Sequence, residues 1–140
     1  GDARLSMERE LAAGEPGQYD VLLLDAFSSD AVPVLLLTAE AFDIYLRHLR
    51  DEDSIIAVNI SNRFIDLRPV VAALARHCKF YAVRVNGPGD PPWPIPSNWV
   101  LLTRNRAFVQ HPAVRRVAAP NVATREILWT DTYSNILRLL

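Results

Sequence analysis

Two carboxylates follow the first strongly apolar run of the chain. Residues 21–24 read Val-Leu-Leu-Leu, Asp25 comes directly after them, and Asp30 comes five positions later. Two carboxylates held close together beside buried strands raise each other's pKa, so that one of them can act as a general base. Aspartate is also a frequent cap of turns and helices. The residues alone therefore leave two interpretations open, a carboxylate site and local capping.

A carboxylate site needs strands to position it. The apolar run at residues 21–24, with polar flanks, is typical of a strand buried on both faces. A second such run spans residues 54–60 and is followed by polar residues. Ligands bind outside the carboxyl ends of the strands in open parallel sheets, so one polar rim is expected there. Its expected members are Asp25, Ser28, Ser29, Asp30, Asn59, Ser61 and Asn62.

Two helices are predicted between the strands. Thr38 is a suitable cap for a helix whose apolar residues reach Leu49, and Pro69 suits the first turn of a second helix. Helical crossovers between buried strands predict right-handed β-α-β units and a parallel sheet.

The rest of the chain predicts a hairpin and shorter elements. Strands are expected at residues 80–85 and 99–103, joined by a glycine- and proline-rich loop at 86–96. A short helix is expected within 112–119, and an apolar helical turn or two near the end. The predicted fold class is α/β: about four strands, mostly parallel, with an antiparallel hairpin at the C-terminal end.

Composition excludes several classes of function. The 140 residues suit one domain, and the net charge of −1 has no basic block that would favour nucleic acid or a membrane surface. No apolar run approaches the ~20 residues of a membrane-spanning helix, so a cytoplasmic location is expected. The single cysteine, Cys78, is expected to be an inert structural thiol. The dispersed His48, His77 and His111 predict no metal site, and each is expected to be solvated or to cap the C-terminal end of a helix.

Two further features have alternative interpretations. The proline-rich loop around Trp93 is either a stiff connector, which its composition favours, or a lid over a ligand. Asp131 either caps a helix, the commoner role, or reaches towards the polar rim.

Four short motifs resemble the spermidine synthase family. They are GDAR at residues 1–4, YDVLLLDAFSSD at 19–30, ISNR at 60–63 and WTDTYSN at 129–135. More narrowly, the chain looks like bacterial spermidine synthase-like proteins, some of which are fused to membrane transporter domains. These are aminopropyltransferases of polyamine biosynthesis, built on the Rossmann-like sheet of S-adenosylmethionine-dependent methyltransferases.

The resemblance spans the whole chain but only the C-terminal part of that fold. The family's glycine-rich cofactor loop would precede Gly1. Residues 1–140 are therefore expected to form a single domain that lacks the N-terminal cofactor half and has no turnover by itself.

The resemblance also assigns roles to site residues. Asp2 and Ala3 match the pair that holds the adenine ring of the co-substrate. Asp25 matches the first aspartate of the family's Asp-x-x-Asp motif, the base for the attacking amine. Asp30 resembles the second aspartate, which anchors the substrate ammonium, although five positions rather than three separate the two acids. Ser28 is a further candidate for the amine pocket.

The implied reaction is aminopropyl transfer from decarboxylated S-adenosylmethionine to a small amine, without a metal ion. The alternatives are methyl transfer from S-adenosylmethionine and a non-catalytic structural or oligomerisation domain. An unpaired apolar edge at residues 21–24 would invite a second chain, so a homodimer is expected.

Overall fold

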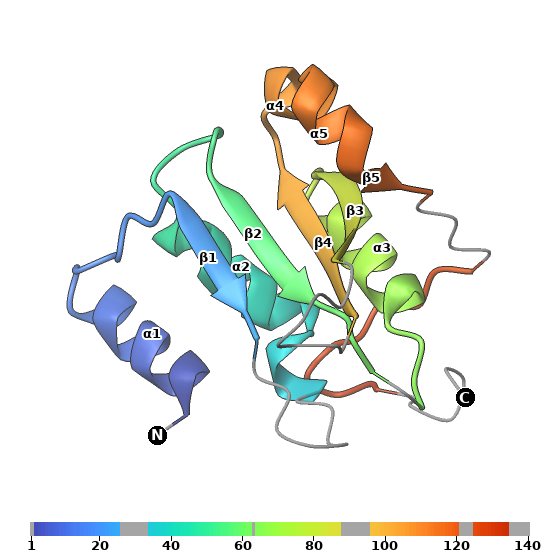
Figure 1. The fold of residues 1–140 in the computed structure, drawn as a ribbon. Coiled ribbons are helices and arrows are strands. Elements are labelled where there is room, and N and C mark those ends of the chain that lie inside the picture. Colours follow the sequence, from blue (N-terminus) through green and yellow to red (C-terminus); the bar gives the residue numbers. More distant parts are fainter. Residues whose placement is uncertain (1, 26–33, 63, 88–95, 121–124, 135–140) are drawn as a thin grey trace.

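The computed structural model describes residues 2–25, 34–62, 64–87, 96–120 and 125–134 (Figure 1). Strands and helices alternate through most of this part of the chain. In order they are α1 (Ala3–Ala12), β1 (Val21–Leu24), the 3-10 helix η1 (Val34–Leu36), α2 (Ala39–His48), β2 (Ile55–Asn59), α3 (Arg68–His77), β3 (Tyr81–Gly87), β4 (Ser97–Thr103), α4 (Arg106–Gln110), α5 (Pro112–Val117) and β5 (Ala118–Ala119).

The strands form one mixed sheet in the order β1-β2-β4-β3-β5. β1 pairs in parallel with β2, whereas β4 pairs antiparallel with both β2 and β3, and β5 pairs antiparallel with β3. β1, β2 and β3 therefore all run in the same direction. The α/β class and the antiparallel β3–β4 hairpin are confirmed.

The predicted pairing was partly wrong. A mostly parallel sheet with the hairpin at one edge was expected, but the one parallel pair among the described strands is β1–β2. The reason is that the crossover through α3 passes over one strand position. β4 then returns through the hairpin and fills that position between β2 and β3.

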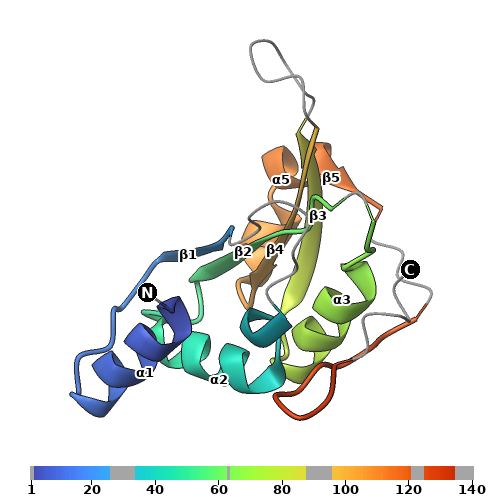
Figure 2. The ribbon, with the colours of Figure 1, turned by 90° about the horizontal axis from the view of Figure 1, so that it is seen from below.

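Helices α2 and α3 cover one face of the sheet (Figure 2). Alternate residues of β2 and β4 point towards them, and Ile56, Val58, Val100 and Leu102 are almost completely buried. Burial of each such side chain stabilises the fold by about 1.5–3 kcal/mol. Thr38 caps α2 as predicted, because its Oγ1 accepts a hydrogen bond from the Ala41 amide at 3.2 Å.

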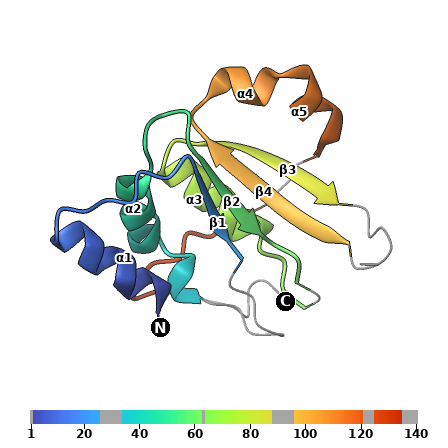
Figure 3. The same cartoon turned by 60° about the vertical axis from the view of Figure 1, so that its left-hand side comes forward.

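The other face is covered unevenly. α4 and α5 lie over β3 and β4 (Figure 3), but they do not reach β1. Leu22 and Leu24 pack against the core, whereas Val21 is 54% exposed and Leu23 is 64% exposed. The strand at 21–24 is confirmed, but it is buried on one face and not on both as expected.

The last described segment of the chain contains a turn. Residues 125–134 contain a bridge between Thr130 and Tyr133, and the segment beyond, where a helical turn was expected, lies outside the described residues. The loop around Trp93 also lies outside them. No helix of the described residues has the length and apolar character needed to cross a bilayer.

Candidate functional site

Asp25 lies at the carboxyl end of β1, beside the end of β2. Leu24 pairs with Val58 in the parallel register, so the next residues, Asp25 and Asn59, are neighbours. The Nδ2 of Asn59 donates a hydrogen bond to Oδ1 of Asp25 at 2.7 Å. Asp25 is exposed, and its Oδ2 has no hydrogen bond to any described residue. Among the described residues, Asn59 therefore holds the carboxylate through Oδ1, and none of them binds Oδ2.

The loop after β2 orients the amide of Asn59. Its Oδ1 accepts a hydrogen bond from the Ser61 amide at 2.8 Å, so Nδ2 is the group that faces Asp25. The Oγ of Ser61 in turn accepts from the Asn98 amide at 2.7 Å, which ties the loop to β4. These polar residues follow the strand as predicted, and through Asn59 their contacts link Asp25 to the loop after β2 and to β4.

Three members of the expected rim fall in a part of the chain that the structure does not describe. Ser28, Ser29 and Asp30 belong to residues 26–33, between β1 and η1. Whether Asp30 or Ser28 faces Asp25 therefore stays a prediction.

Asp2 forms the N-terminal cap of α1. Its Oδ1 accepts hydrogen bonds from the amides of Arg4, at 2.9 Å, and Leu5, at 3.4 Å. Ala3 is the first residue of the helix, and both Asp2 and Ala3 are exposed. The amino-terminal end of α1 lies at the same end of the sheet as the carboxyl end of β1 (Figures 1 and 3). Capping uses one carboxylate oxygen of Asp2, and its role towards adenine stays a prediction.

A charged cluster that the sequence did not predict lies at the same end of the sheet. The guanidinium of Arg4 donates two hydrogen bonds to the carboxylate of Asp131, one of them 2.7 Å long to Oδ1. Thr38 donates from Oγ1 to the same Oδ1 at 2.8 Å. We call Arg4, Thr38 and Asp131 the Arg4 clamp. Sequence reasoning missed it because 127 positions separate Arg4 from Asp131 and no local pattern pairs them.

The pairing sets the charge state of Asp131. Its hydrogen bonds with Arg4 are the main cause that lowers the pKa of Asp131 from 3.8 to about 2, and the Thr38 bond adds to them. The same pairing raises the pKa of Arg4. Asp131 caps no helix in the described part of the chain, so the favoured expectation for it was wrong. Its carboxylate is engaged by Arg4.

Comparison with known proteins identifies the fold. No protein-family model matches the chain, and a search of curated proteins finds no match. Among solved structures, the crystal structure of a probable spermidine synthase from Corynebacterium glutamicum ATCC 13032 is similar, with a TM-score of 0.53 and 22% sequence identity. The match covers 83% of this chain and 42% of that one. The fold is spermidine synthase-like. At this identity the likeness concerns the fold, and the chain spans less than half of the other protein's length.

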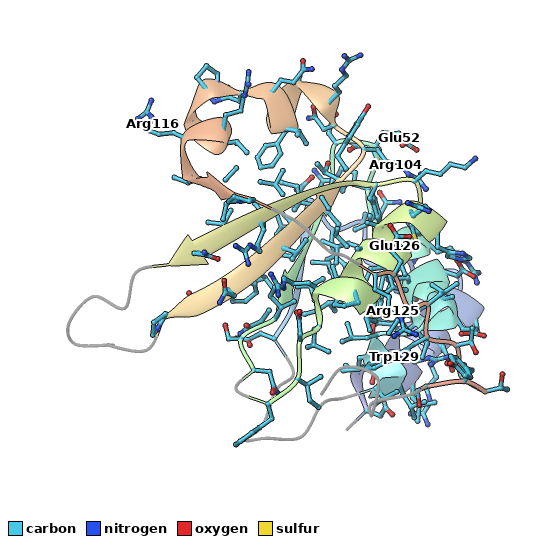
Figure 4. All side chains as sticks on the ribbon, turned by 90° about the vertical axis from the view of Figure 1, so that its right-hand side faces the viewer. Glu52, Arg104, Arg116, Arg125, Glu126 and Trp129 are labelled. Carbon is cyan, nitrogen blue, oxygen red and sulfur yellow. The ribbon has the colours of Figure 1, made fainter. Side chains whose placement is uncertain are left out.

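The spermidine synthase-like fold also has a cavity at its opposite end. It measures about 240 Å³ and lies at the amino-terminal ends of β2 and β3. Figure 4 shows Glu52 and Arg104 at this end, away from Trp129. Arg104 donates to Glu52 and to the Cys78 carbonyl, so its guanidinium is already engaged. The cavity is therefore not part of the rim that holds Asp25. Its lining residues are Leu46, Leu49, Arg50, Asp51, Glu52, Phe80 and Arg104.

The histidines have different roles. His48 was expected to be solvated or to cap a helix, but it is completely buried. Its Nδ1 accepts from the Gly17 amide at 2.9 Å, so the ring is neutral and Nε2 donates to the Met7 carbonyl at 2.9 Å. His77 is half-exposed, and His111 caps α5 through its Nδ1. Within the described residues no group of histidine, cysteine and carboxylate side chains could hold a metal ion.

Cys78 ends α3 in the core. It is 3% exposed, and desolvation, together with the charge of Asp43, raises the pKa of its thiol to about 11. A thiol of this kind is a poor nucleophile at neutral pH. Its burial supports the structural role predicted for it.

Proposed function

We propose that the chain is part of an aminopropyltransferase in which Asp25 binds and deprotonates the attacking amine. The co-substrate is decarboxylated S-adenosylmethionine. The observation that carries this proposal is the Asp25–Asn59 pair at the carboxyl ends of β1 and β2, in a spermidine synthase-like fold. Ligands of open α/β sheets bind at this edge.

The chemistry needs a carboxylate with one free oxygen. A primary amine is protonated at neutral pH, because its pKa lies near that of lysine at about 10.4, and in this form it cannot attack carbon. Oδ2 of Asp25 first binds the ammonium group. As ligands displace water, the carboxylate accepts the proton from the bound ammonium. Asn59 holds Oδ1 throughout, so the free oxygen keeps its direction.

The freed nitrogen lone pair then attacks the methylene carbon through which the aminopropyl group is bonded to the sulfonium sulfur. The new C–N bond forms while the C–S bond breaks, and its electron pair goes to sulfur. The products are an aminopropylated amine and methylthioadenosine, and the proton lost by the amine is on Asp25. This displacement needs no metal ion. In the same proposal Asp2 and Ala3 hold adenine, while Asp30 and Ser28 bind the far end of the amine.

Product analysis tests this proposal. The full-length protein that contains this chain is incubated with an amine series and either decarboxylated S-adenosylmethionine or S-adenosylmethionine, and the nucleoside product is identified by mass spectrometry. We expect methylthioadenosine with the first co-substrate. Formation of S-adenosylhomocysteine with the second alone would instead indicate a methyltransferase. Absence of both products, together with absence of binding of either co-substrate by calorimetry, would overturn an enzymatic role.

A second proposed role is self-association through β1. The described residues place no strand beside its free edge, and Val21 and Leu23 are exposed on its uncovered face. If the β1 edges of two copies paired about a two-fold axis, Val21 and Leu23 of both copies would lie on the same face of the joined sheet. They would then stay exposed. Packing of the uncovered face of β1 against the same face of a second copy covers Val21 and Leu23. We therefore propose a homodimer whose contact lies on this face.

A further inference from the structure

We propose that Arg4 and Asp131 are positioning residues, which hold the Asp2 end of α1 at the rim and thereby set the affinity for the adenosine part of the co-substrate. The affinity part of this inference rests on the proposed function. The positioning part rests on contacts of the described residues alone.

The guanidinium of Arg4 joins four segments of the chain. Its Nε donates to Glu8 on α1 at 3.2 Å, and one terminal nitrogen donates to the Leu35 carbonyl of η1 at 3.0 Å. Both terminal nitrogens donate to Asp131, and Thr38 at the start of α2 binds the same carboxylate. The side chain of Arg4 is only 14% exposed. A planar fork that makes bidentate bonds is specific to arginine, and lysine cannot reproduce it.

Helix α1 has few other attachments near its first turn. None of its residues is fully buried, and Met7 is the one that packs against the core. The hydrogen bond from His48 reaches the carbonyl of Met7, further along the helix. Among the described residues, Arg4 therefore makes the main connection of the amino-terminal turn to the other segments.

The clamp is coupled to Asp2 through the helix cap. Asp2 binds the amides of Arg4 and Leu5 through its side chain, and its carbonyl accepts from the Ser6 amide at 3.1 Å. A shift of Arg4 thus shifts Asp2 with it. Arg4 also binds the Leu35 carbonyl, which follows shortly after the segment that contains Asp30.

Hydrogen exchange tests the positioning directly. In Arg4→Met we expect the amides of Leu5 and Ser6 to exchange at least about tenfold faster, a factor equivalent to ~1.4 kcal/mol. Arg9→Met is the matched control, since Arg9 is an exposed arginine of the same helix. Asp131→Asn, which keeps the shape of the side chain, should reproduce the Arg4→Met result. Unchanged exchange in a folded Arg4→Met protein would overturn the proposal.

Calorimetry then separates positioning from general destabilisation. The probes are methylthioadenosine and a diamine, each titrated into the full-length protein that contains this chain, as the wild type, Arg4→Met and Arg9→Met. We expect methylthioadenosine to bind roughly tenfold more weakly to Arg4→Met, with diamine affinity unchanged. An equal loss for both probes would contradict the positioning role. If the wild type binds no methylthioadenosine, the proposed effect on co-substrate affinity is rejected together with the proposed function. Hydrogen exchange then still tests whether the Arg4 clamp holds α1.

Discussion

Asp131 keeps its negative charge against the guanidinium of Arg4, and this pairing makes stability depend on pH in the acid range. The pKa of Asp131 is lowered from 3.8 to about 2 in the folded protein. A lowered pKa means that the stabilisation is fully present above pH 3.8 and is lost as the pH falls through about 2. Because the carboxylate is about one-third exposed, solvent screening reduces the expected contribution to about 1 kcal/mol.

Urea unfolding of the wild type and of Asp131→Asn measures this contribution. We expect the difference in the free energy of unfolding to be largest at neutral pH and to shrink between pH 4 and pH 2, about the range set by the two pKa values. Asp53→Asn is a suitable control, because Asp53 is an exposed acid remote from the clamp. A difference that stays constant down to pH 2 would show that Asp131 acts through shape and not through charge.

At the residue scale the sequence predicted part of the site. Asp25 could be placed at a rim because a buried strand ends where its apolar run ends, and strand ends share one edge of a parallel sheet. The hydrogen bond from Asn59 follows from the register of β1 and β2, which periodicity does not specify. Asp131 could not be assigned, because its partners Arg4 and Thr38 are distant in sequence.

Helix α1 is attached to α2 by a buried histidine as well as by the clamp. The neutral ring of His48 bridges the Gly17 amide and the Met7 carbonyl, with Glu10 3.8 Å from Nδ1 and Tyr19 stacked on the ring. In His48→Leu both bonds are lost and no side-chain partner replaces them. We expect a loss of about 1–3 kcal/mol in stability, with faster hydrogen exchange concentrated in α1.

The matched control for this prediction is His77→Leu. His77 also ends a helix, but its side chain is 39% exposed, so its replacement should change stability by less than about 0.5 kcal/mol. Equal effects of the two substitutions, or exchange that increases uniformly over the whole protein, would contradict a specific attachment of α1 by His48.

At the element scale the sequence predicted the elements better than their pairing. The strand at Val21–Leu24 and the helix capped by Thr38 were confirmed, because apolar runs and caps are local signals. The position of β4 between β2 and β3 was not predicted. The hairpin signal shows that β4 pairs with β3, but it does not show which strand pairs with the other edge of β4. The exposed face of β1 was missed for a related reason: an apolar run does not reveal what covers it.

At the scale of the whole molecule, the uncovered face of β1 predicts association. Light scattering at tens of micromolar should give twice the mass of the chain, and Leu23→Lys should give the mass of one chain, because a charge on that face opposes apolar contact. Phe64→Lys is the control, since Phe64 is 62% exposed in the loop between β2 and α3. A monomeric wild type, or dissociation by both substitutions, would contradict a contact at β1.

The amino-terminal end of α1, the carboxyl ends of β1 and β2 and the turn at 125–134 lie at one end of the molecule (Figure 1). In the proposed reaction Asp25 acts on the amine at this end. The most direct measurement is the release of methylthioadenosine by the full-length protein that contains this chain, as the wild type and with Asp25→Asn or Asp20→Asn. Asp20 is an exposed aspartate just before β1, paired with Arg50 at the other end of the strand.

We predict that Asp25→Asn lowers the rate of release by about 10²–10⁴-fold, the usual contribution of a general base, and that Asp20→Asn leaves it unchanged. Wild-type rates in folded Asp25→Asn would contradict the assignment of Asp25 as the base.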